Sequence, residues 1–261
     1  MTQPSQQVLY EEIHDEYVRH LYDKTSNAYR DAFINSALFN GVDLDGKTMA
    51  EIMCGNGQAT LYAKSRFPSL NCHGFDISRR ACDDYTRSTG FPATVSDILT
   101  EPLPREAFDA IVVVGGFHHV VRELDAAMTN VHNALRPGGV LLMMEPNSDY
   151  VLESLRRIWY RADRYFDADD ERALSYRTLH ARYRDKFDER GVWHRGGPGY
   201  FLILMSMVFR IPLSAKRYFA PPLMVLETMW NLIPFRRAHA FFAAQWTKRD
   251  SSSDRVPRAT P

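Results

Sequence analysis

The chain has 261 residues, 45% of them hydrophobic, and its 32 basic and 32 acidic residues give a formal net charge of zero. This length and composition suffice for one buried core with an appended region. A zero net charge excludes a general attraction to nucleic acid and leaves open only local basic patches.

The N-terminal 40 residues are expected to be helical. Residues 1–7 are polar and lack the apolar region of a secretory signal, and residues 8–40 carry apolar and aromatic side chains at helical spacing. Tyr22, Tyr29 and Arg30 lie in this part. Their hydroxyl and guanidinium groups suit contacts with a bound carboxylate or acceptor. The alternative is a surface helix whose tyrosines pack on a sheet.

A short strand and a glycine turn follow residues 41–47. Glu51 closes the strand, Gly55 and Gly57 form the turn, and a helix begins near Thr60. Glycine allows positive φ and close backbone approach to a ligand, and a helix N-terminus offers unpaired N–H groups. A dinucleotide motif would have a third glycine where Thr60 stands. Taken alone, a pair of glycines after a strand is also typical of a tight turn that binds no ligand.

Two acidic residues end the next two predicted strands. Residues 71–76 form an apolar run that closes on Asp76, and residues 93–98 contain Asp97 followed by Ile98. A carboxylate at such a position suits a ribose diol, and Asp97 with Ile98 suits an adenine amino group and ring. Each aspartate taken singly is also a typical helix N-cap.

Two more strands complete the predicted sheet. Residues 108–116 form a β-branched run without alternation, as expected for a strand covered on both faces. Residues 135–139 end a helix and turn into a strand over 140–145. Strands and helices alternate through this region, which predicts an α/β, Rossmann-like, doubly wound and mostly parallel sheet.

In this order and spacing, the motifs resemble class I S-adenosylmethionine (SAM) dependent methyltransferases over about residues 40–147. The resemblance implies SAM as cofactor, with the methionine part at the loop after the first strand, the ribose at Asp76 and the adenine at Asp97. Members of that family usually carry glycine where this chain has Met53. The residues implied in cofactor binding, together with the N-terminal candidates, are Glu51, Met53, Gly55, Gly57, Asp76, Ile77, Asp97, Ile98, Gly115, Gly116, Tyr22, Tyr29 and Arg30.

The candidate catalytic residues are His118 and His119, directly after the fourth strand. A histidine titrates near neutral pH and is a natural base for an acceptor hydroxyl. The alternative is that the pair shapes the pocket without moving a proton. Glu145, at the end of the fifth strand, is expected to face the same pocket. No cluster with metal-ligand spacing occurs, so no metal is predicted.

Beyond residue 148 the pattern changes. Residues 149–190 are charged at helical spacing and include an arginine cluster that suits either solvent or an anionic surface. Residues 191–199 are predicted to be a loop. Residues 200–235 are apolar but too interrupted to span a bilayer, and they favour a helical subdomain, a hydrophobic substrate pocket or a lipid-facing patch. Residues 240–246 are a candidate last strand.

The predicted organisation is a helical lid over 1–40, a SAM-binding core over 41–148, a substrate-side region over 149–250 and a disordered tail over 251–261. Cys54, Cys72 and Cys82 lack ligand or disulfide spacing, which favours reduced thiols and a cytoplasmic setting. The predicted function is methyl transfer to a small apolar or aromatic metabolite. Peripheral lipid contact, SAM binding without transfer, and methylation of RNA or protein are the alternatives; the oligomeric state is left open.

Overall fold

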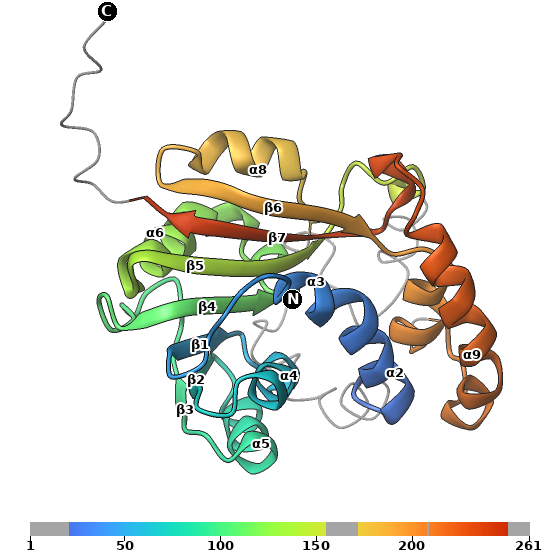
Figure 1. Ribbon diagram of the computed structural model, residues 1–261, viewed down its shortest axis with the longest axis horizontal. Coiled ribbons are helices and arrows are strands. Elements are labelled where there is room, and N and C mark those ends of the chain that lie inside the picture. The colour runs from blue at the N-terminus through green and yellow to red at the C-terminus, as the bar shows by residue number, and fades with distance from the viewer. Residues whose placement is uncertain (1–20, 155–171, 208, 250–261) are drawn as a thin grey trace, which may run out of the picture.

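The computed structural model describes residues 21–154, 172–207 and 209–249 (Figure 1). Sequence predictions for the first 20 residues, the arginine cluster near 156–164 and the C-terminal tail lie outside these ranges. The described chain folds around one sheet whose helices cover both faces, and α9 stands at the side toward which most strands point.

The sheet has seven strands in the order β3-β2-β1-β4-β5-β7-β6. Strands β1 to β5 pair in parallel, whereas β7 runs antiparallel to both β5 and β6. This arrangement confirms the predicted Rossmann-like, doubly wound fold. The strands are β1 (Thr48–Ile52), β2 (Asn71–Asp76), β3 (Ala93–Val95), β4 (Phe108–Val114), β5 (Leu135–Pro146), β6 (Phe187–Arg195) and β7 (Phe241–Lys248).

The central strands divide their side chains between two hydrophobic clusters. Met49 and Val112 face one cluster, and the alternate residues Ala50 and Val113 face the other. The first cluster is covered by the N-terminal helices and α4 (Gln58–Arg66), and the second by α6 (Leu124–Ala134) and α8 (Tyr176–Tyr183). Because both faces are buried, these strands need no polar positions, which explains the uninterrupted β-branched run in β4.

Strand β6 corrects one sequence prediction. Residues 191–199 were expected to form a loop, and the usual pair of final strands was not visible, yet β6 extends over Phe187–Arg195 and pairs with β7. β6 is an edge strand, and most of its residues are exposed or half-buried. An edge strand with so little burial lacks the apolar alternation by which strands are recognised. The predicted last strand is confirmed as β7.

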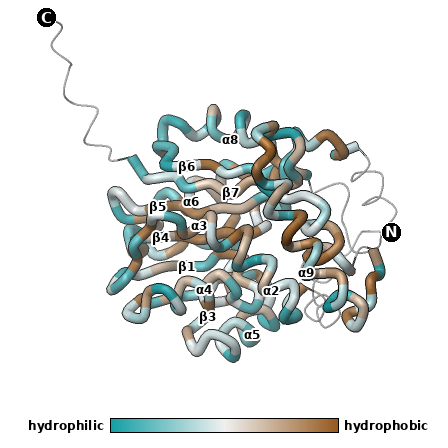
Figure 2. Tube along the Cα trace, turned by 45° about the vertical axis from the view of Figure 1, so that its right-hand side comes forward, coloured by the Kyte–Doolittle hydropathy of each residue, from teal (hydrophilic) through white to brown (hydrophobic). Residues whose placement is uncertain are grey.

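The N-terminal helical segment and the helices over residues 200–230 meet at one side of the sheet. The N-terminal helical segment comprises α2 (Lys24–Tyr29), η1 (Arg30–Asn35) and α3 (Ser36–Leu38), and α2 lies against α9 (Leu213–Trp230) and η4 (Tyr200–Leu204) in both views (Figures 1 and 2). Residues 200–204 and 213–230 of the apolar stretch are thus helical. Over the described residues, no helix has the length and apolar character needed to cross a membrane.

The remaining described elements connect these layers. Helix α5 (Arg79–Thr89) follows β2, and the short turns η2 (Phe117–His119) and η3 (Val121–Glu123) follow β4. A last turn, η5 (Arg236–Ala238), leads into β7. The loops after β1, β2, β3 and β4 all leave the same edge of the sheet, because parallel strands have their carboxyl ends together.

Candidate functional site

A pocket lies at the carboxyl ends of the parallel strands, where a doubly wound fold places its ligand. It brings together nine of the sequence-predicted residues, which come from the lid, the loop after β1, the end of β2, the segment after β3 and the turn after β4. They are Tyr22, Met53, Gly55, Asp76, Ile77, Asp97, Ile98, Gly115 and His119. Gly57, Glu51, Gly116, His118, Tyr29 and Arg30 do not line it.

Two glycines of the loop after β1 serve different contacts. Both have positive φ, 50° at Gly55 and 80° at Gly57. A Cβ at Gly55 would lie 2.9 Å from the Tyr22 hydroxyl oxygen, so this glycine admits the lid tyrosine to the pocket. A Cβ at Gly57 would lie 2.4 Å from Thr89 Cγ2, so Gly57 allows α5 to pack against the loop. Gly57 therefore serves the packing of α5 against the loop and does not line the pocket.

Met53 takes a left-handed conformation, with φ of 53°, at the position where glycine was expected. This conformation costs a non-glycine residue about 1 to 2 kcal/mol. Gly116 accommodates the side chain, since a Cβ at Gly116 would lie 2.4 Å from Met53 Sδ. The departure from the expected glycine is thus matched by a glycine on the facing loop, and Met53 lines the pocket instead of closing it.

Glu51 lies beneath the pocket. Its side chain is buried, and Oε2 accepts a hydrogen bond of 2.9 Å from the Thr60 backbone N–H in the first turn of α4. Burial raises the pKa of Glu51 to about 7, against the opposing effect of the hydrogen bonds from Thr60. In this arrangement Glu51 fixes the start of α4, and with it the loop that faces the ligand.

Asp76 and Asp97 are not helix N-caps, since Ser78 caps α5 and a turn rather than a helix follows Asp97. Asp76 accepts hydrogen bonds from the N–H groups of Gly55 at 3.1 Å and Ser78 at 2.9 Å, and Asp97 accepts from Leu99 N–H at 2.9 Å. Each aspartate therefore orders its own loop. Both also line the pocket, and an ionised carboxylate has about four acceptor sites, so each retains capacity for a ligand donor.

The turn after β4 is held by Glu145, which is fully buried at the end of β5. Its carboxylate accepts from the backbone N–H groups of Gly116 at 3.0 Å, Phe117 at 2.8 Å and His118 at 3.2 Å, and it pairs with His118 Nδ1 at 2.9 Å. The rings of His118 and His119 have centroids 4.0 Å apart. His118 is thus directed to Glu145, and His119 is the histidine that faces the pocket.

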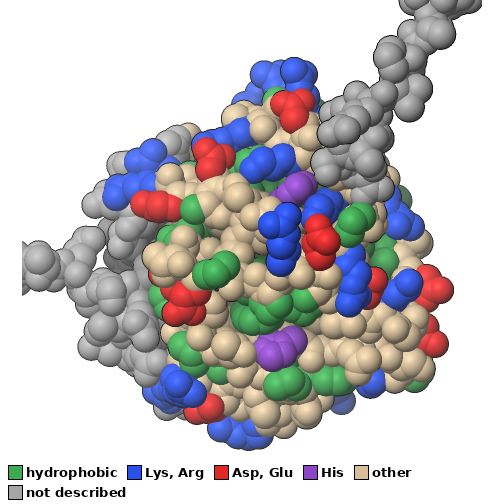
Figure 3. Space-filling view, turned by 90° about the vertical axis from the view of Figure 1, so that its left-hand side faces the viewer, with side chains coloured by type: hydrophobic (Ala, Val, Ile, Leu, Met, Phe, Trp, Pro, Cys, Tyr) green, Lys and Arg blue, Asp and Glu red, His purple; other side chains and the backbone are tan. Residues whose placement is uncertain are grey.

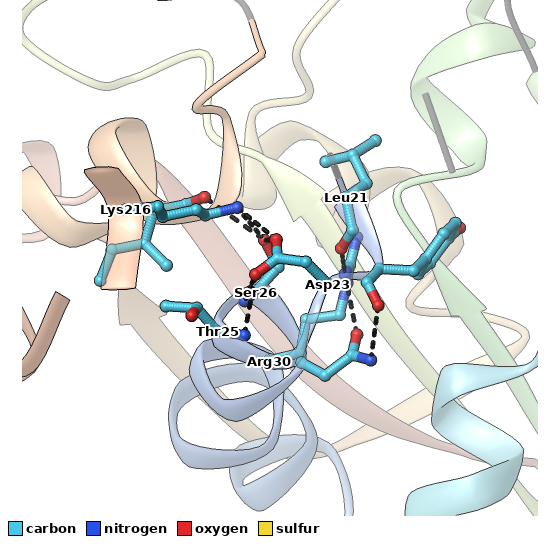
Figure 4. A network of polar contacts seen from close by, with 9 residues as sticks. Leu21, Asp23, Thr25, Ser26, Arg30 and Lys216 are labelled. Atoms are coloured by element: carbon cyan, nitrogen blue, oxygen red, sulfur yellow. Dashed lines mark hydrogen bonds and ion pairs between the residues drawn. The ribbon is translucent and has the colours of Figure 1, made fainter. Parts of the chain in front are cut away.

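The lid residues separate into one that lines the pocket and two that do not. Arg30 lies over the Tyr22 ring, 4.6 Å from its centroid, and donates to the Leu21 carbonyl oxygen (Figure 4). Tyr29 is fully buried and donates to Glu227 of α9. The structure therefore does not bring Tyr29 or Arg30 to the pocket, because α9 and Leu21 engage their polar groups.

A buried ion pair, which the sequence did not indicate, joins the lid to α9 (Figure 4). Lys216 Nζ lies 2.5 Å from Asp23 Oδ2 and 2.5 Å from Ser26 Oγ, and the lysine is completely buried. Asp23 also caps α2 by accepting from Thr25 N–H at 2.9 Å. The available signal was that charged residues, Lys216 and Glu227 among them, interrupt an otherwise apolar helix.

Within the described ranges there is no group of histidine, cysteine and acidic residues arranged to hold a metal ion. Cys54, Cys72 and Cys82 are buried and free. The polar side chains that line the pocket are two carboxylates, one imidazole, one phenol, the Asn56 amide and the Ser96 hydroxyl, and the rest of the lining is mainly apolar.

The family comparison matches residues 49–139 to the family described as methyltransferase domain. A fatty-acid O-methyltransferase of Mycolicibacterium smegmatis is 26% identical over 140 residues, which are 52% of this chain and 50% of that protein. The alignment thus spans half the length of that relative. It does not include all of the flanking helices of this chain.

Structure comparison extends the likeness beyond the matched segment. A possible histamine N-methyltransferase of Thermotoga maritima has a TM-score of 0.66 at 17% identity, over 93% of this chain and 99% of that one. The [4+2]-cyclase SpnF has a TM-score of 0.62 at 16% identity, over 94% and 97%. At such identities the likeness concerns the fold, and it includes the helical additions.

Proposed function

We propose that the chain is a SAM-dependent methyltransferase acting on a small apolar or lipid-like acceptor, a proposal supported by the match of residues 49–139 to a methyltransferase domain and by the Rossmann-like order of the strands. The observation that carries the proposal is the pocket itself. It gathers Gly55, Asp76, Asp97 and His119 at the carboxyl edge of the sheet. Four separate segments of the chain contribute these residues, each at the end of a strand.

The donor set of the pocket fits SAM. Asp76 at the end of β2 offers acceptor oxygens to a ribose diol, and Asp97 offers them to an adenine amino group. Ile98 lines the same part of the pocket and presents an apolar surface to a flat base. Gly55 leaves the loop after β1 without a Cβ, so the backbone stays accessible below Tyr22.

When bound, SAM would supply an electrophilic methyl group: the acceptor nucleophile would bond to the methyl carbon while the carbon–sulfur bond opposite breaks and S-adenosylhomocysteine leaves. The protein's part is to align the acceptor and exclude water. Tyr22 covers the loop from the lid side, and Met53 fills the space beside Gly116. His119 presents its ring at the turn after β4, where it contacts the acceptor and is placed to take a proton from a hydroxyl.

Glu145 acts through this turn. By accepting three backbone N–H groups and the His118 ring, it fixes the backbone that carries His119. The rings of His118 and His119 pack together, so the orientation of the second depends on the first. Glu145 is therefore a positioning residue for His119.

The apolar character of the acceptor is supported by two observations. The relative from Mycolicibacterium smegmatis is described as a fatty-acid O-methyltransferase. The part of this chain outside the matched domain contributes many apolar residues, including half-buried Phe201, Met205 and Leu223 packed against the core beside α2. A cytoplasmic location stays a prediction from the three unpaired cysteines.

A second candidate is a protein that binds SAM and does not transfer its methyl group. The observation that favours it is the likeness to SpnF, whose description names a cyclase on the same fold. Methylation of RNA or protein has weaker support, since the net charge is zero. The methyltransferase and the protein that binds SAM without transfer differ in whether SAM is converted to S-adenosylhomocysteine.

The test is the formation of S-adenosylhomocysteine by purified protein with SAM and a panel of fatty acids, quinols, phenols and amines. Methyl transfer to an apolar acceptor supports the proposal. For His119→Ala we expect unchanged affinity for SAM and at least a tenfold lower turnover, since base catalysis typically contributes about a hundredfold or more. The proposal is contradicted if the protein binds SAM but forms no product with any member of the panel. It is also contradicted if total RNA is the only acceptor that is methylated.

A further inference from the structure

Helix α9 buries two of its three charged residues, Lys216 and Glu227, and exposes Arg217 together with several apolar residues. Lys216 and Glu227 are completely buried against the lid and the 196–199 turn. The opposite side of the helix and the turn after it expose large apolar side chains, which we call the α9 face: Tyr218 (71% exposed), Val225 (64%), Met229 (62%), Leu232 (79%) and Phe235 (55%). An exposed set of this kind marks an interaction surface.

The exposed charged residues that residues 210–249 contribute around the α9 face are all basic, and Asp149 is an exposed acidic residue whose backbone carbonyl accepts a hydrogen bond from Arg237. Arg210, Arg217, Arg236 and Arg237 are all exposed. Glu227 is the only acidic residue between Arg210 and Arg249 in the sequence, and it is buried. Apolar side chains flanked by arginines are typical of segments that lie in the headgroup region of an anionic membrane.

The opposite side of the molecule has a different surface. Figure 3 shows Lys and Arg side chains interspersed with Asp and Glu, and its hydrophobic groups are scattered between them. The α9 face lies at the other side, toward which β4 and β5 point (Figure 1). It is thus on the side of the sheet at which the pocket opens.

We propose that the α9 face docks on an anionic lipid surface. The apolar side chains enter the headgroup region, and the four arginines meet the lipid phosphates. The inference stands apart from the proposed methyl transfer, because it rests on surface residues outside the pocket.

A second copy of the chain fits this surface less well than lipid. A two-fold interface applies the same patch to itself. The arginines around one α9 face would then approach those of the other, with no exposed carboxylate in residues 210–249 to balance them. An anionic partner removes that repulsion.

The experiment is flotation of the full chain with vesicles of phosphatidylcholine alone and of phosphatidylcholine mixed with phosphatidylglycerol. We expect binding to the anionic vesicles that weakens as salt rises. Leu232→Ser/Phe235→Ser should lower the partition coefficient by about tenfold or more, through lost apolar burial. Arg236→Gln/Arg237→Gln should lower it by about tenfold and remove the preference for anionic vesicles.

Matched controls use the same substitutions elsewhere. Leu61→Ser changes an exposed apolar residue of α4, and Arg87→Gln/Arg184→Gln removes two exposed arginines far from α9 in the sequence. Both should bind as wild type does. Thermal unfolding establishes that each variant is folded. This control involves no cofactor, so the result is independent of the proposed function.

Three outcomes overturn the proposal. The first is that wild type floats with neither kind of vesicle. The second is that wild type floats equally with both kinds, or that the control variants lose as much vesicle binding as the variants of the α9 face and its arginines. The third is sedimentation of wild type as a dimer that Leu232→Ser/Phe235→Ser converts to monomer, without vesicle binding. That last result would assign the α9 face to a second copy.

Discussion

Buried charged groups are stabilised differently in the cofactor core and in the contact between α2 and α9. In the core, Glu51 and Glu145 accept hydrogen bonds mainly from backbone N–H groups at loops that follow parallel strands. Between the helices, Asp23 meets Lys216 and Tyr29 meets Glu227, pairs of side chains about 190 residues apart. In the core, the backbone therefore supplies the partners of the buried carboxylates. The contact between α2 and α9 instead needs particular side chains that lie far apart in the sequence.

This difference indicates where specificity resides. Any sequence that forms β1, β4 and β5 brings backbone amides to these carboxylates, so the core geometry is general. The contact between α2 and α9 depends on Asp23, and Asp23 adjoins Tyr22, which lines the pocket.

The comparison is tested most strongly at Glu145. Replacing Glu145 by Ala leaves the N–H groups of Gly116, Phe117 and His118 without their acceptor, at about 1 to 3 kcal/mol for each buried group. We expect the free energy of unfolding to fall by about 4 kcal/mol, measured by urea denaturation. Glu145→Gln keeps one acceptor oxygen and should lose less. A fall under about 1 kcal/mol in Glu145→Ala contradicts the assigned role.

Glu51 gives a pH dependence of opposite sign to that of an ordinary surface carboxylate. The folded protein holds the Glu51 proton up to a pKa of about 7, whereas the unfolded chain releases it near 4.5. Between these values the folded state binds more protons, so the contribution of Glu51 to the free energy of unfolding falls as pH rises through this window.

The expected size of that fall is about 3 kcal/mol, from a shift of about 2.5 pKa units. Above the folded pKa the contribution is constant. Urea denaturation of wild type and Glu51→Gln at about pH 5 and about pH 8 measures it, since the glutamine variant lacks this titration. Equal pH dependence in the two proteins would contradict the assignment.

The pair between the lid and α9 is tested by a double-mutant cycle. Lys216→Met leaves Asp23 and Ser26 without the ammonium group, and we expect a loss of about 2 kcal/mol in the free energy of unfolding. Asp23→Asn/Lys216→Met should lose less than the sum of the single changes, by about 1 kcal/mol or more. Additive losses would mean that the two residues act separately.

The parallel core was predictable because its signals are local. β4 and β5 are buried on both faces and therefore read as apolar runs, and Gly55 and Asp76 stand at the strand ends where the topology requires them. Met53 shows the limit of such patterns. Its left-handed backbone depends on Gly116, far away in the sequence, which gives room to the side chain.

The other features that the sequence did not predict share a physical cause. Each of them depends on a partner residue or strand that sequence spacing does not reveal. β6 is an edge strand, so its residues carry no apolar alternation. Tyr29 and Arg30 have the chemistry of ligand contacts, but Glu227 and the Leu21 carbonyl engage their polar groups. Lys216 and Glu227 interrupt an apolar run, and that interruption was the one visible trace of the contact with α2.

The most direct test of the central claim is calorimetric titration of the full chain with SAM and with S-adenosylhomocysteine, using Asp76→Ala beside wild type. We predict saturable binding of both ligands by wild type. The variant should bind more weakly by about 1 to 3 kcal/mol, because the ribose loses its carboxylate acceptor. Undetectable binding of both ligands by wild type, or equal affinity in the variant, would contradict the assignment of this pocket to SAM.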